Sequence, residues 1–344
     1  MSNNSLKILL IKRGAMGDIL MATPLIRQLK TKLNCTLDFL VGKSASIVLK
    51  NNPYIDYMHV LADRDLTLKG FFRFSLYLIK MRKRYDYVFI LDKHWYFSLQ
   101  AKLLATVTIG FRRDFLSSLF LNKSVHYYDV TRYQGLYYLD LLQISTLALA
   151  NYADIALDLL ITDNDKLRVQ QLLKDYDINQ FCIVVNSGGN NSYEKTGIRM
   201  LQKKKIIQLL QLLLPTKTVI LLGGRNDTDN YNEYMKELNK FDNLFNFAGL
   251  LSIAESAYLI SLAEHFYTTD CGVMHMGIAA NVVTKMTAFF GPTSPTHFLP
   301  QTYLEKSRVI WNDQGIYQPA YQLKGVKNNI KYFTTLDIDT LDMK

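Results

Sequence analysis

The segment Thr269-Asp270-Cys271-Gly272-Val273-Met274-His275 constrains the fold of this chain more than any other. An apolar run precedes it, and a second apolar run, Met286–Phe290, follows shortly and ends in a Gly-Pro turn. This order predicts a strand, a tight glycine-containing turn, a helix and another strand. Such a turn directs free backbone N–H groups and the positive helix end at one spot, which suits a phosphate. Gly272 lets a ligand approach the backbone closely, and Asp270 is placed to hold a ribose or sugar hydroxyl.

The beginning of the chain predicts a second turn of this kind. Leu6–Ile11 form an apolar strand, and Lys12-Arg13-Gly14-Ala15-Met16-Gly17-Asp18 follows as a glycine-containing turn. Thr23-Pro24 predicts the N-cap and the first residue of a helix. The pattern leaves open whether residues 18–22 already belong to this helix. In either case Asp18 is expected in the loop above the carboxyl end of the strand, where open α/β sheets bind ligands.

Strand-like and helical patterns alternate along the first half. The apolar runs that predict strands are Leu6–Ile11, Thr36–Val41, Tyr57–Leu61 and Tyr87–Leu91. This alternation predicts a doubly wound parallel sheet of the α/β class. A long helical pattern over 129–149 and an acidic, irregular stretch over 151–165 close this half, so we place the domain boundary between residues 1–164 and 165–344.

The second half repeats the alternation. The runs Phe181–Asn186 and Thr218–Leu222 predict strands, each followed by a glycine pair. Between them, residues 199–214 predict an amphipathic helix that Pro215 stops. Residues 252–255 form a capping box at the start of a later helix. We therefore expect two similar α/β domains.

Composition narrows the class of protein and of partner. Charged residues make up 20% of the 344 residues and hydrophobic residues 49%, which is typical of a globular chain. The net charge of +10 favours an anionic partner. Nucleic acid, a phosphorylated glycolipid, a membrane surface and a nucleotide-sugar all satisfy this condition, and the charge does not choose among them.

Three cysteines are far apart and form no C-x-x-C pair. Cys35 and Cys182 lie beside strand-like runs and are expected to be buried thiols, which fits a reducing cytoplasm. The polar residues 1–5 do not resemble a signal peptide. Acidic and amide side chains interrupt the most apolar long window, 136–161, so no bilayer span is expected. A cytoplasmic protein is the resulting prediction.

The two turns together resemble those of a known family. The stretches IKRGAMGDILMATPLIRQL and TTDCGVMHMGIAANVVTKMTAFFGPTSPTHFLP are similar to the motifs of glycosyltransferase family 9, the ADP-heptose:lipopolysaccharide heptosyltransferases. They lie in opposite halves at roughly the family's spacing, with weaker similarity between them. The resemblance implies the GT-B fold, in which two Rossmann-like doubly wound domains face a central cleft. It places the acceptor in the N-terminal domain (1–164) and the nucleotide-sugar in the C-terminal domain (165–344).

The resemblance also implies catalytic roles. Asp18 matches the aspartate of the family's Gly-Asp motif, which takes the proton from the attacking hydroxyl as general base; from the residues alone it is a helix-capping aspartate. Lys195 matches a lysine expected to clamp the diphosphate and stabilise charge on the departing nucleotide, and its alternative is a loop lysine in solvent. The family often has Lys-x-Trp here, whereas this chain has Lys195-Thr196-Gly197 and lacks the aromatic side chain.

The same match implies further donor-site residues. Asp227 stands where the family carries an acid for the nucleoside, with a turn aspartate as the alternative. Asp270, Cys271, Gly272 and His275 match the family's Asp-(Ser/Thr)-Gly-x-x-His. Cys271 replaces a hydroxyl residue, and a thiol is a weaker hydrogen-bond donor. No base is evident beside Cys271, which disfavours a nucleophilic role, and His275 is expected to support the turn structurally.

No metal ion is expected. Asp63-Arg64-Asp65 imitates the Asp-x-Asp motif of metal-dependent transferases, but other Asp-x-Asp strings occur at 163, 175 and 337, and the histidines show no zinc-type spacing. Lys195 and a helix end can replace a divalent cation. Residues 317–321 stand where some family members carry cysteines, so no metal is expected there either.

The basic, aromatic segment 71–84 is a candidate contact with a membrane or with lipid phosphates. The alternative is a helix that packs on the sheet and carries a solvated basic end. The sequence pattern leaves both open.

The predicted function is an inverting, metal-independent glycosyltransferase that needs no cofactor and moves a heptose from ADP-heptose to a lipopolysaccharide core acceptor. Its partners are then a nucleotide-sugar and an anionic glycolipid, with peripheral contact at the inner face of the inner membrane and no nucleic acid. The alternatives are a family 9 transferase that uses another nucleotide-sugar, a GT-B nucleotide-sugar epimerase, and a non-catalytic nucleotide-sugar-binding protein. A dinucleotide oxidoreductase is disfavoured, because no G-x-G-x-x-G follows the first strand.

Overall fold

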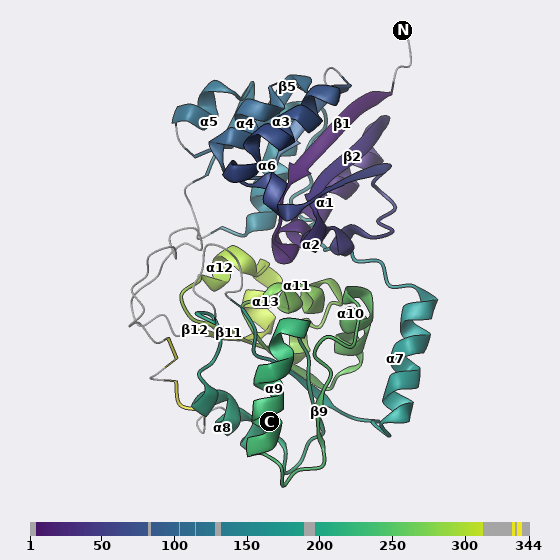
Figure 1. Cartoon of the computed structure of the whole chain (residues 1–344), viewed down its shortest axis with the longest axis vertical. Coiled ribbons are helices and arrows are strands. Elements are labelled where there is room, and N and C mark those ends of the chain that lie inside the picture. Colours follow the sequence, from purple (N-terminus) through teal and green to yellow (C-terminus); the bar gives the residue numbers. More distant parts are fainter. Residues whose placement is uncertain are drawn as a thin grey trace. The chain divides into compact units, whose positions relative to one another are not determined.

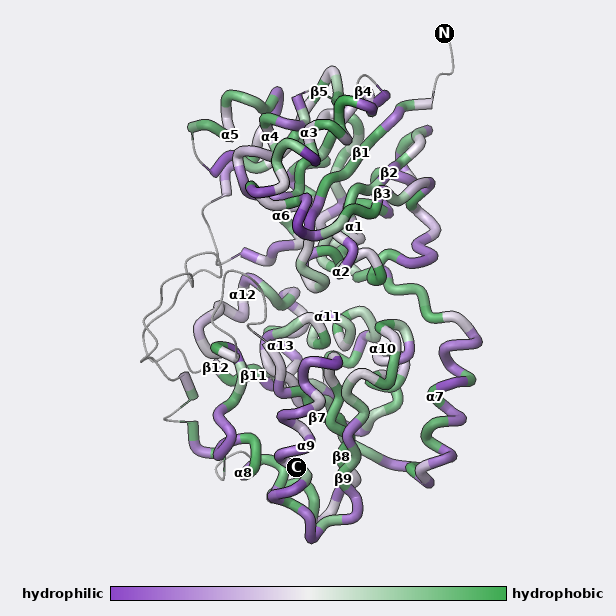
Figure 2. The backbone as a smooth tube through the Cα atoms, in the orientation of Figure 1, coloured by the Kyte–Doolittle hydropathy of each residue, from purple (hydrophilic) through white to green (hydrophobic). Residues whose placement is uncertain are grey.

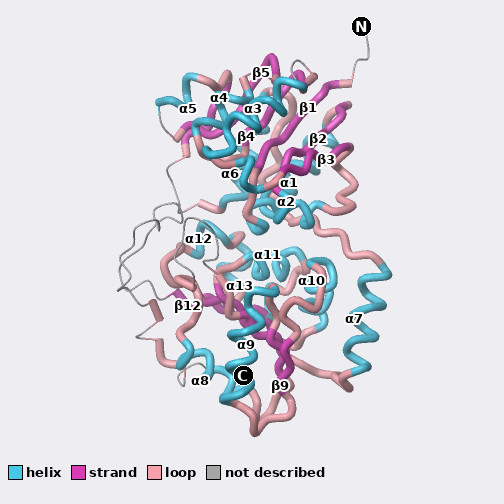
Figure 3. Tube along the Cα trace, in the orientation of Figure 1, coloured by secondary structure: helices cyan, strands magenta, loops and turns pink. Residues whose placement is uncertain are grey.

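The computed structural model describes residues 5–81, 84–102, 104–113, 115–127, 132–188, 197–311, 332–333 and 336–338. The chain forms two compact units, Met1–Leu160 and Ile161–Lys344. Within the described residues, each unit contains a six-stranded sheet of parallel strands with helices between them (Figures 1 and 3). The predicted α/β class with two doubly wound sheets is confirmed.

The sheet of the first unit has the strand order β3-β2-β1-β4-β5-β6. Its strands are β1 (Leu6–Lys12), β2 (Cys35–Gly42), β3 (Tyr57–Leu61), β4 (Tyr85–Ile90), β5 (Ala105–Arg112) and β6 (Lys123–His126). Its helices are α1 (Met16–Lys32), α2 (Lys43–Ser46), α3 (Phe71–Lys80), α4 (Trp95–Ala101), α5 (Phe115–Leu119) and α6 (Gln134–Ser145).

The sheet of the second unit has the strand order β12-β11-β10-β7-β8-β9. Its strands are β7 (Cys182–Val185), β8 (Val219–Leu221), β9 (Leu244–Asn246), β10 (His265–Thr269), β11 (Met286–Phe290) and β12 (Arg308–Trp311). Its α-helices are α7 (Asp163–Asp175), α8 (Lys203–Leu213), α9 (Thr228–Glu237), α10 (Ile253–Leu262), α11 (Gly272–Ala279), α12 (Pro295–Phe298) and α13 (Gln301–Lys306).

Both sheets have the same topology. Counted within its own unit, each has the order 3-2-1-4-5-6, since the second sheet reads β9-β8-β7-β10-β11-β12 from its other edge. This is the order of the Rossmann fold, in which the connections leave in opposite directions from the first and fourth strands. Such sheets bind ligands at the carboxyl ends of these two strands. The candidate positions are therefore the loops after β1 and β4, and after β7 and β10.

Helix α1 begins earlier than the sequence pattern predicts. It starts at Met16, so the prediction of an N-cap at Thr23 is wrong and Pro24 lies inside the helix. A proline has no N–H to offer the carbonyl four residues before it, which here belongs to Leu20. The Thr23 hydroxyl donates to that carbonyl instead, at 2.7 Å. Burial of the apolar side chains around this point stabilises the helix across the proline.

Other helix limits also refine the sequence analysis. Thr162 forms a capping box that opens α7 at Asp163, within the stretch expected to be irregular. Helix α8 begins at Lys203, four residues after the expected start at Arg199. The capping box of Ser252 and Glu255 at the start of α10 is confirmed.

Apolar side chains fill the space between each sheet and its helices. The middle of strand β1, from Ile8 to Ile11, and most of helix α10 are hydrophobic, whereas α9 is largely hydrophilic (Figure 2). Cys35, Cys182 and Cys271 are free and buried, which confirms the expected state of the first two. Within the described parts of the chain, no helix combines the length and apolar character needed to cross a bilayer.

One close contact yields a stability prediction. A Cβ added at Gly277 of α11 would lie 2.5 and 2.9 Å from ring carbons of the fully buried Phe266 in β10. We expect Gly277→Ala to lower the free energy of unfolding by about 1–3 kcal/mol through overpacking, although alanine is the better helix former by about 1 kcal/mol. Chemical denaturation measures the change.

Gly224→Ala is the matched control for this prediction, because its added Cβ would lie 3.8 Å from Asp227 Oδ2, an ordinary van der Waals contact. Its free energy of unfolding should stay within about 0.5 kcal/mol of wild type. Equal stability of Gly277→Ala and the wild type would contradict the tight packing of α11 on β10.

Candidate functional site

Charged side chains gather after β1 in the first unit. Lys12 ends β1 and is buried, and Asp18 stands in the first turn of α1 with 28% of its side chain exposed. Lys12 Nζ lies 3.1 Å from Asp18 Oδ2. Burial of the Lys12 ammonium lowers its pKa, but the negative charges of Asp18 and Asp92 outweigh this effect. The pKa of Lys12 is therefore raised, and this lysine stays charged beside Asp18.

The residues after β4 complete this charge cluster. Asp92 is buried and accepts a hydrogen bond of 2.6 Å from the backbone N–H of Arg13, which ties the ends of β4 and β1 together. Lys93 donates to Gln134 Oε1 at 3.0 Å and to the Tyr127 hydroxyl, and its Nζ lies 3.8 Å from the centre of the Tyr127 ring. Burial lowers the pKa of Lys93 to about 7, so this side chain titrates near neutral pH.

The position of Asp18 differs from the expected loop, because α1 already begins at Met16. A carboxylate in the first turn of a helix is favoured by the helix dipole. Asp18 is also partly open to solvent and lies beside an ammonium group. A carboxylate in this setting can accept a proton from a hydroxyl group, while Lys12 and Lys93 contribute positive charge next to it.

Two loops of the second unit meet after β7 and β10. Thr269 ends β10, and its hydroxyl accepts from the backbone N–H of Ser187 at 3.1 Å and donates to the Ser187 carbonyl. The Asp270 carboxylate, almost fully buried, accepts from Arg199 Nη1 at 3.0 Å and from the Thr293 hydroxyl at 2.6 Å. This arrangement favours a role for Asp270 in positioning Arg199 rather than in direct contact with a sugar hydroxyl.

Gly188 is the residue where this junction needs a glycine. Its φ of +135° lies in a region that side-chain-bearing residues rarely adopt. A Cβ there would also lie 3.0 Å from the Asp270 carbonyl oxygen and 3.1 Å from Arg199 Cβ. The missing side chain lets the loop after β7 approach the Asp270 turn.

Asp227 follows β8 and joins the same group of loops. It is buried, and its carboxylate accepts from the backbone N–H of Gly224 at 2.8 Å. Burial raises the pKa of Asp227, while hydrogen bonds from Gly224 and Ser187 act in the opposite direction. Ser187 thus contacts both Asp227 and Thr269, so the ends of β7, β8 and β10 form one cluster.

The remaining residues of the predicted donor turn lie in and before α11. Cys271 is the N-cap residue of α11, and Gly272 is its first residue. Burial raises the pKa of the Cys271 thiol, whose Sγ lies 3.9 Å from the Thr268 hydroxyl, so a reactive thiolate is disfavoured. His275 is buried one turn later, with its ring 6.3 Å from that of Phe298 in an edge-on contact.

Lys195 and residues 317–321 lie outside the described residues. Asp63 accepts hydrogen bonds from the backbone and hydroxyl of Ser44, whereas Asp65 pairs with Arg73 at 3.0 Å. The two carboxylates of this Asp-x-Asp string thus have separate partners. In the parts of the chain that the structure describes, no three histidine, cysteine, aspartate or glutamate side chains gather as a metal site.

Sequence reasoning did not identify five residues of these clusters, namely Lys12, Asp92, Lys93, Arg199 and Thr293. One signal was present for two of them: Asp92 and Lys93 directly follow the predicted strand that ends at Leu91. Because β4 pairs with β1, these residues had to lie near the turn that holds Asp18. Arg199 and Thr293 meet Asp270 only through the fold.

Comparison with known proteins gives a family match. Residues 205–328 match the family model of glycosyltransferase family 9 (heptosyltransferase). Lipopolysaccharide heptosyltransferase 2 of Salmonella typhimurium is 31% identical over 102 residues. That alignment spans 29% of this chain and 28% of the length of the relative.

Solved structures of low sequence identity share the fold. A family 9 glycosyltransferase from Veillonella parvula has a TM-score of 0.70 at 17% identity, with 90% of this chain and 86% of that chain covered. ADP-heptose lipopolysaccharide heptosyltransferase II of E. coli has a TM-score of 0.68 at 18% identity, covering 89% and 90%. The E. coli heptosyltransferase WaaC with ADP-2-deoxy-2-fluoro heptose has a TM-score of 0.61 at 15% identity, covering 89% and 92%. The predicted GT-B fold class is confirmed.

The lowered pKa of Lys93 predicts a pH-dependent stability. An unfolded lysine keeps its proton up to about pH 10.4, whereas folded Lys93 loses it near pH 7. The unfolded state then binds more protons between these values, so stability rises with pH there. We expect Lys93→Met to stabilise the protein relative to wild type most at pH 7 and below, and progressively less as the pH rises towards 10.

Denaturation of both proteins from pH 6 to pH 9.5 measures this difference. Lys102→Met, at an exposed position beyond α4, is the matched control and should show a difference that does not change with pH. A pH-independent difference for Lys93→Met as well would contradict the lowered pKa.

Proposed function

We propose that this chain is a member of glycosyltransferase family 9 and moves a heptose from a nucleotide-sugar to a lipopolysaccharide core acceptor. One observation carries the proposal: both family motifs lie next to the strands where the sheet order reverses. Asp18 follows β1, and Asp270 to Gly272 follow β10. The family match of residues 205–328 supports it. The first unit then binds the acceptor and the second the nucleotide-sugar.

The charge cluster of the first unit supports an acid–base role for Asp18. As the acceptor hydroxyl oxygen forms its bond to the anomeric carbon, Asp18 takes the hydroxyl proton and the bond to the diphosphate breaks. The new bond forms on the face opposite the leaving group, so the configuration inverts. Lys12 holds the carboxylate in place through their ion pair, and Lys93 adds charge that suits an anionic acceptor.

The second unit offers groups that suit a diphosphate. The N-terminus of α11 presents backbone N–H groups at Gly272, and Arg199 is held nearby by Asp270. We infer that these groups, together with Lys195, neutralise the charge that develops on the departing nucleotide diphosphate. Asp227 lies in the same group of loops and is the proposed contact to the nucleoside. With the charge neutralised in this way, the reaction needs no divalent cation.

ADP-heptose is the donor that we propose first. Similar solved proteins are described as an ADP-heptose lipopolysaccharide heptosyltransferase and as a heptosyltransferase with an ADP-heptose analogue. Another nucleotide-sugar is the alternative, because Thr196 and Gly197 follow Lys195 where the family often has an aromatic side chain.

We also propose a peripheral membrane contact through α3. Phe72, Leu76 and Ile79 are 80%, 61% and 51% exposed, and their spacing of four and three residues places them on one face of this helix. Arg73 and Lys80 are exposed on the same helix. An apolar helix face accompanied by cations suits the surface of an anionic bilayer, where a lipid-linked acceptor is found.

Asp18→Asn tests the general base. The variant should bind donor as the wild type does, because Asp18 is in the other unit from the donor residues, and kcat should fall about a hundredfold or more. Transfer to lipopolysaccharide core acceptor is measured with ADP-heptose in excess EDTA. Asp229→Asn, at a surface position of α9, should keep full activity.

Full activity of a folded Asp18→Asn variant would reject Asp18 as the base. Loss of wild-type activity in EDTA, restored by Mg²⁺ or Mn²⁺, would instead reject a metal-independent reaction. Transfer from another nucleotide-sugar in preference to ADP-heptose would keep the reaction class and change the donor.

Gly272→Val and Lys195→Ala test the donor site. A valine at Gly272 places a branched side chain where the diphosphate would lie against the backbone, so ADP binding should fail. Loss of the Lys195 cation should weaken ADP binding and lower kcat. Calorimetric titration with ADP measures both, with Ala279→Val at the other end of α11 and the exposed Lys204→Ala as controls that bind normally. Normal ADP binding by both test variants would contradict a donor site in the second unit.

Phe72→Ser and Ile79→Ser test the membrane contact. Both remove exposed apolar surface from α3, so the binding constant for vesicles of phosphatidylglycerol and phosphatidylethanolamine, measured by co-sedimentation, should fall about tenfold or more, since each buried apolar side chain contributes about 1.5–3 kcal/mol. Leu167→Ser in α7 removes a side chain that is likewise exposed and should leave sedimentation unchanged. Equal sedimentation of all variants would show that α3 does not touch the bilayer.

A further inference from the structure

In the sheet of the first unit, unexpected polar side chains lie towards the amino-terminal ends of two neighbouring strands. Side chains on a strand alternate between the two faces, so Asp38 shares a face with Leu40 on β2, and His59 shares a face with Leu61 on β3. Leu40 and Leu61 pack in the apolar cluster with Leu78 of α3. Near the end of α3 the same face thus changes from apolar to polar, on two neighbouring strands.

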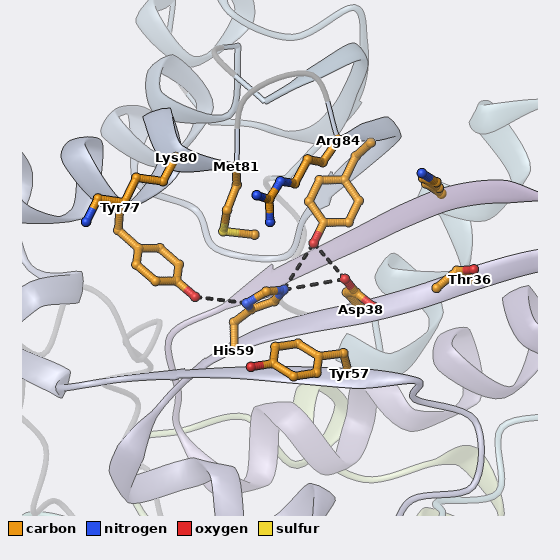
Figure 4. Close-up of a pocket in the computed structure, with 10 residues that line it drawn as sticks. Thr36, Asp38, Tyr57, His59, Tyr77, Lys80, Met81 and Arg84 are labelled. Carbon is orange, nitrogen blue, oxygen red and sulfur yellow. Dashed lines mark hydrogen bonds and ion pairs between the residues drawn. The ribbon is translucent and has the colours of Figure 1, made fainter.

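A pocket of about 660 Å³ opens at this place. The first residues of β3 and β4, the early part of β2 and the last turn of α3 line it (Figure 4). Asp18 and the other candidate catalytic residues of this unit follow the carboxyl ends of strands. The pocket therefore lies towards the opposite, amino-terminal ends of the strands in the same sheet. Its volume is in the range of small-molecule sites.

Hydrogen bonds fix the floor of the pocket. The Tyr85 hydroxyl donates to Asp38 Oδ2 at 2.6 Å, and His59 Nε2 lies 3.0 Å from the Tyr85 oxygen (Figure 4). His59 Nδ1 lies 2.9 Å from the Tyr77 hydroxyl. Tyr85 donates to Asp38, so its oxygen can accept from His59 Nε2, which also lies 3.4 Å from Asp38 Oδ2. The four side chains thus form one chain of donors and acceptors that ends on a carboxylate.

One acceptor in this row of hydrogen bonds has no donor. Asp38 Oδ1 is buried and receives no hydrogen bond from any described residue. A buried carboxylate oxygen without a donor is costly, and a ligand hydroxyl or amine can supply that donor. Burial and the charge of Asp38 raise the pKa of Tyr85, so this phenol stays protonated and its hydroxyl remains committed to Oδ2.

The rim of the pocket has the opposite charge. Among the described residues that line the pocket, the exposed cations are Lys7, Lys80 and Arg84, and the carboxylate is that of Asp38. The Tyr57 ring, 60% exposed, lies edge-on to His59 with 4.6 Å between the ring centres, and lines one wall. A bare anion at the floor would be repelled by Asp38, and an apolar molecule would leave Asp38 Oδ1 without a donor.

We propose that this pocket is a second ligand site, which binds a phosphorylated sugar. A hydroxyl group of the sugar donates to Asp38 Oδ1, the phosphate lies among Lys80, Arg84 and Lys7, and the sugar ring packs against Tyr57. This ligand is neither the donor nor the acceptor of the proposed transfer, because it binds near the amino-terminal ends of the strands, away from Asp18. The proposal goes beyond the transferase function and does not depend on it.

Calorimetric titration of the full chain with glucose 6-phosphate tests the proposal, with glucose and inorganic phosphate as separate titrants. We expect saturable binding of one glucose 6-phosphate per chain, and at least tenfold weaker binding of either titrant alone. Tyr57→Ala and Arg84→Ala change exposed side chains, so they should fold normally and weaken binding tenfold or more. Lys50→Ala removes an exposed cation outside the pocket and should bind as wild type does.

Other results overturn the proposal. It fails if glucose 6-phosphate does not bind, if inorganic phosphate binds equally well, or if Tyr57→Ala and Arg84→Ala bind like wild type. Asp38→Asn should weaken binding in a protein whose circular dichroism is unchanged, and if it does not fold, the two exposed variants decide. Saturating ADP and the Gly272→Val variant should leave binding unchanged. Displacement by ADP would place glucose 6-phosphate in the donor site and refute a second site, whereas absence of glycosyl transfer would leave this result standing.

Discussion

The parallel pairing of β1 with β4 and of β7 with β10 is the constraint on which the rest of each unit depends. The register brings Ile8 opposite Tyr87 in the first sheet and Phe266 opposite Ile183 in the second. Helices cover both faces of such sheets, so the central strands consist of buried, mostly apolar residues. Polar groups are therefore displaced to the strand ends, where reversal of the strand order leaves room for a ligand.

The charged side chains at these strand ends differ between the two units. The first collects Lys12, Asp18, Asp92 and Lys93, of which Lys12 is held charged and Lys93 is close to losing its proton. Such a set suits proton transfer, because its members have unequal affinities for a proton. In the second unit, the buried ion pair of Asp270 and Arg199 holds a permanent cation in a fixed place. A fixed cation beside a helix N-terminus suits a diphosphate, whose negative charge increases as it leaves the sugar.

The sequence predicted the parts of the fold that depend on continuous apolar runs. Strands β1, β2, β3 and β4 were identified because their runs are apolar or aromatic over several residues. Strands β6, β9 and β12 were not, because they are short strands near or at the sheet edges with a mixed burial pattern. The start of α1 was mistaken, because Pro24 in the sequence looks like a first helical residue and only the Thr23 side chain reveals how the helix continues through it.

For the candidate site, the sequence identified the residues that belong to contiguous motifs and missed those that only the fold brings together. Asp270 to His275 and Asp18 belong to contiguous motifs, so the sequence alone identified them as candidates. Lys93 and Arg199 could not be identified in this way, because their hydrogen-bond partners lie far away in the sequence. Lys93 donates to Gln134, and Arg199 donates to Asp270. The pocket around Asp38 and His59 was not predicted for a related reason. Each is an isolated polar residue in its strand, and only the pairing of β2 with β3 brings the two together.

The Thr23 hydroxyl has a second partner, and this has a mechanical consequence. It accepts from the backbone N–H of Asp158 at 2.8 Å, while Arg27 pairs with Asp154 and Asp158. The chain leaving the first unit is thus fastened along α1, the helix that carries Asp18. Loss of the Thr23 hydroxyl would release both this end of the first unit and the helical turn at Pro24, because the same oxygen serves both.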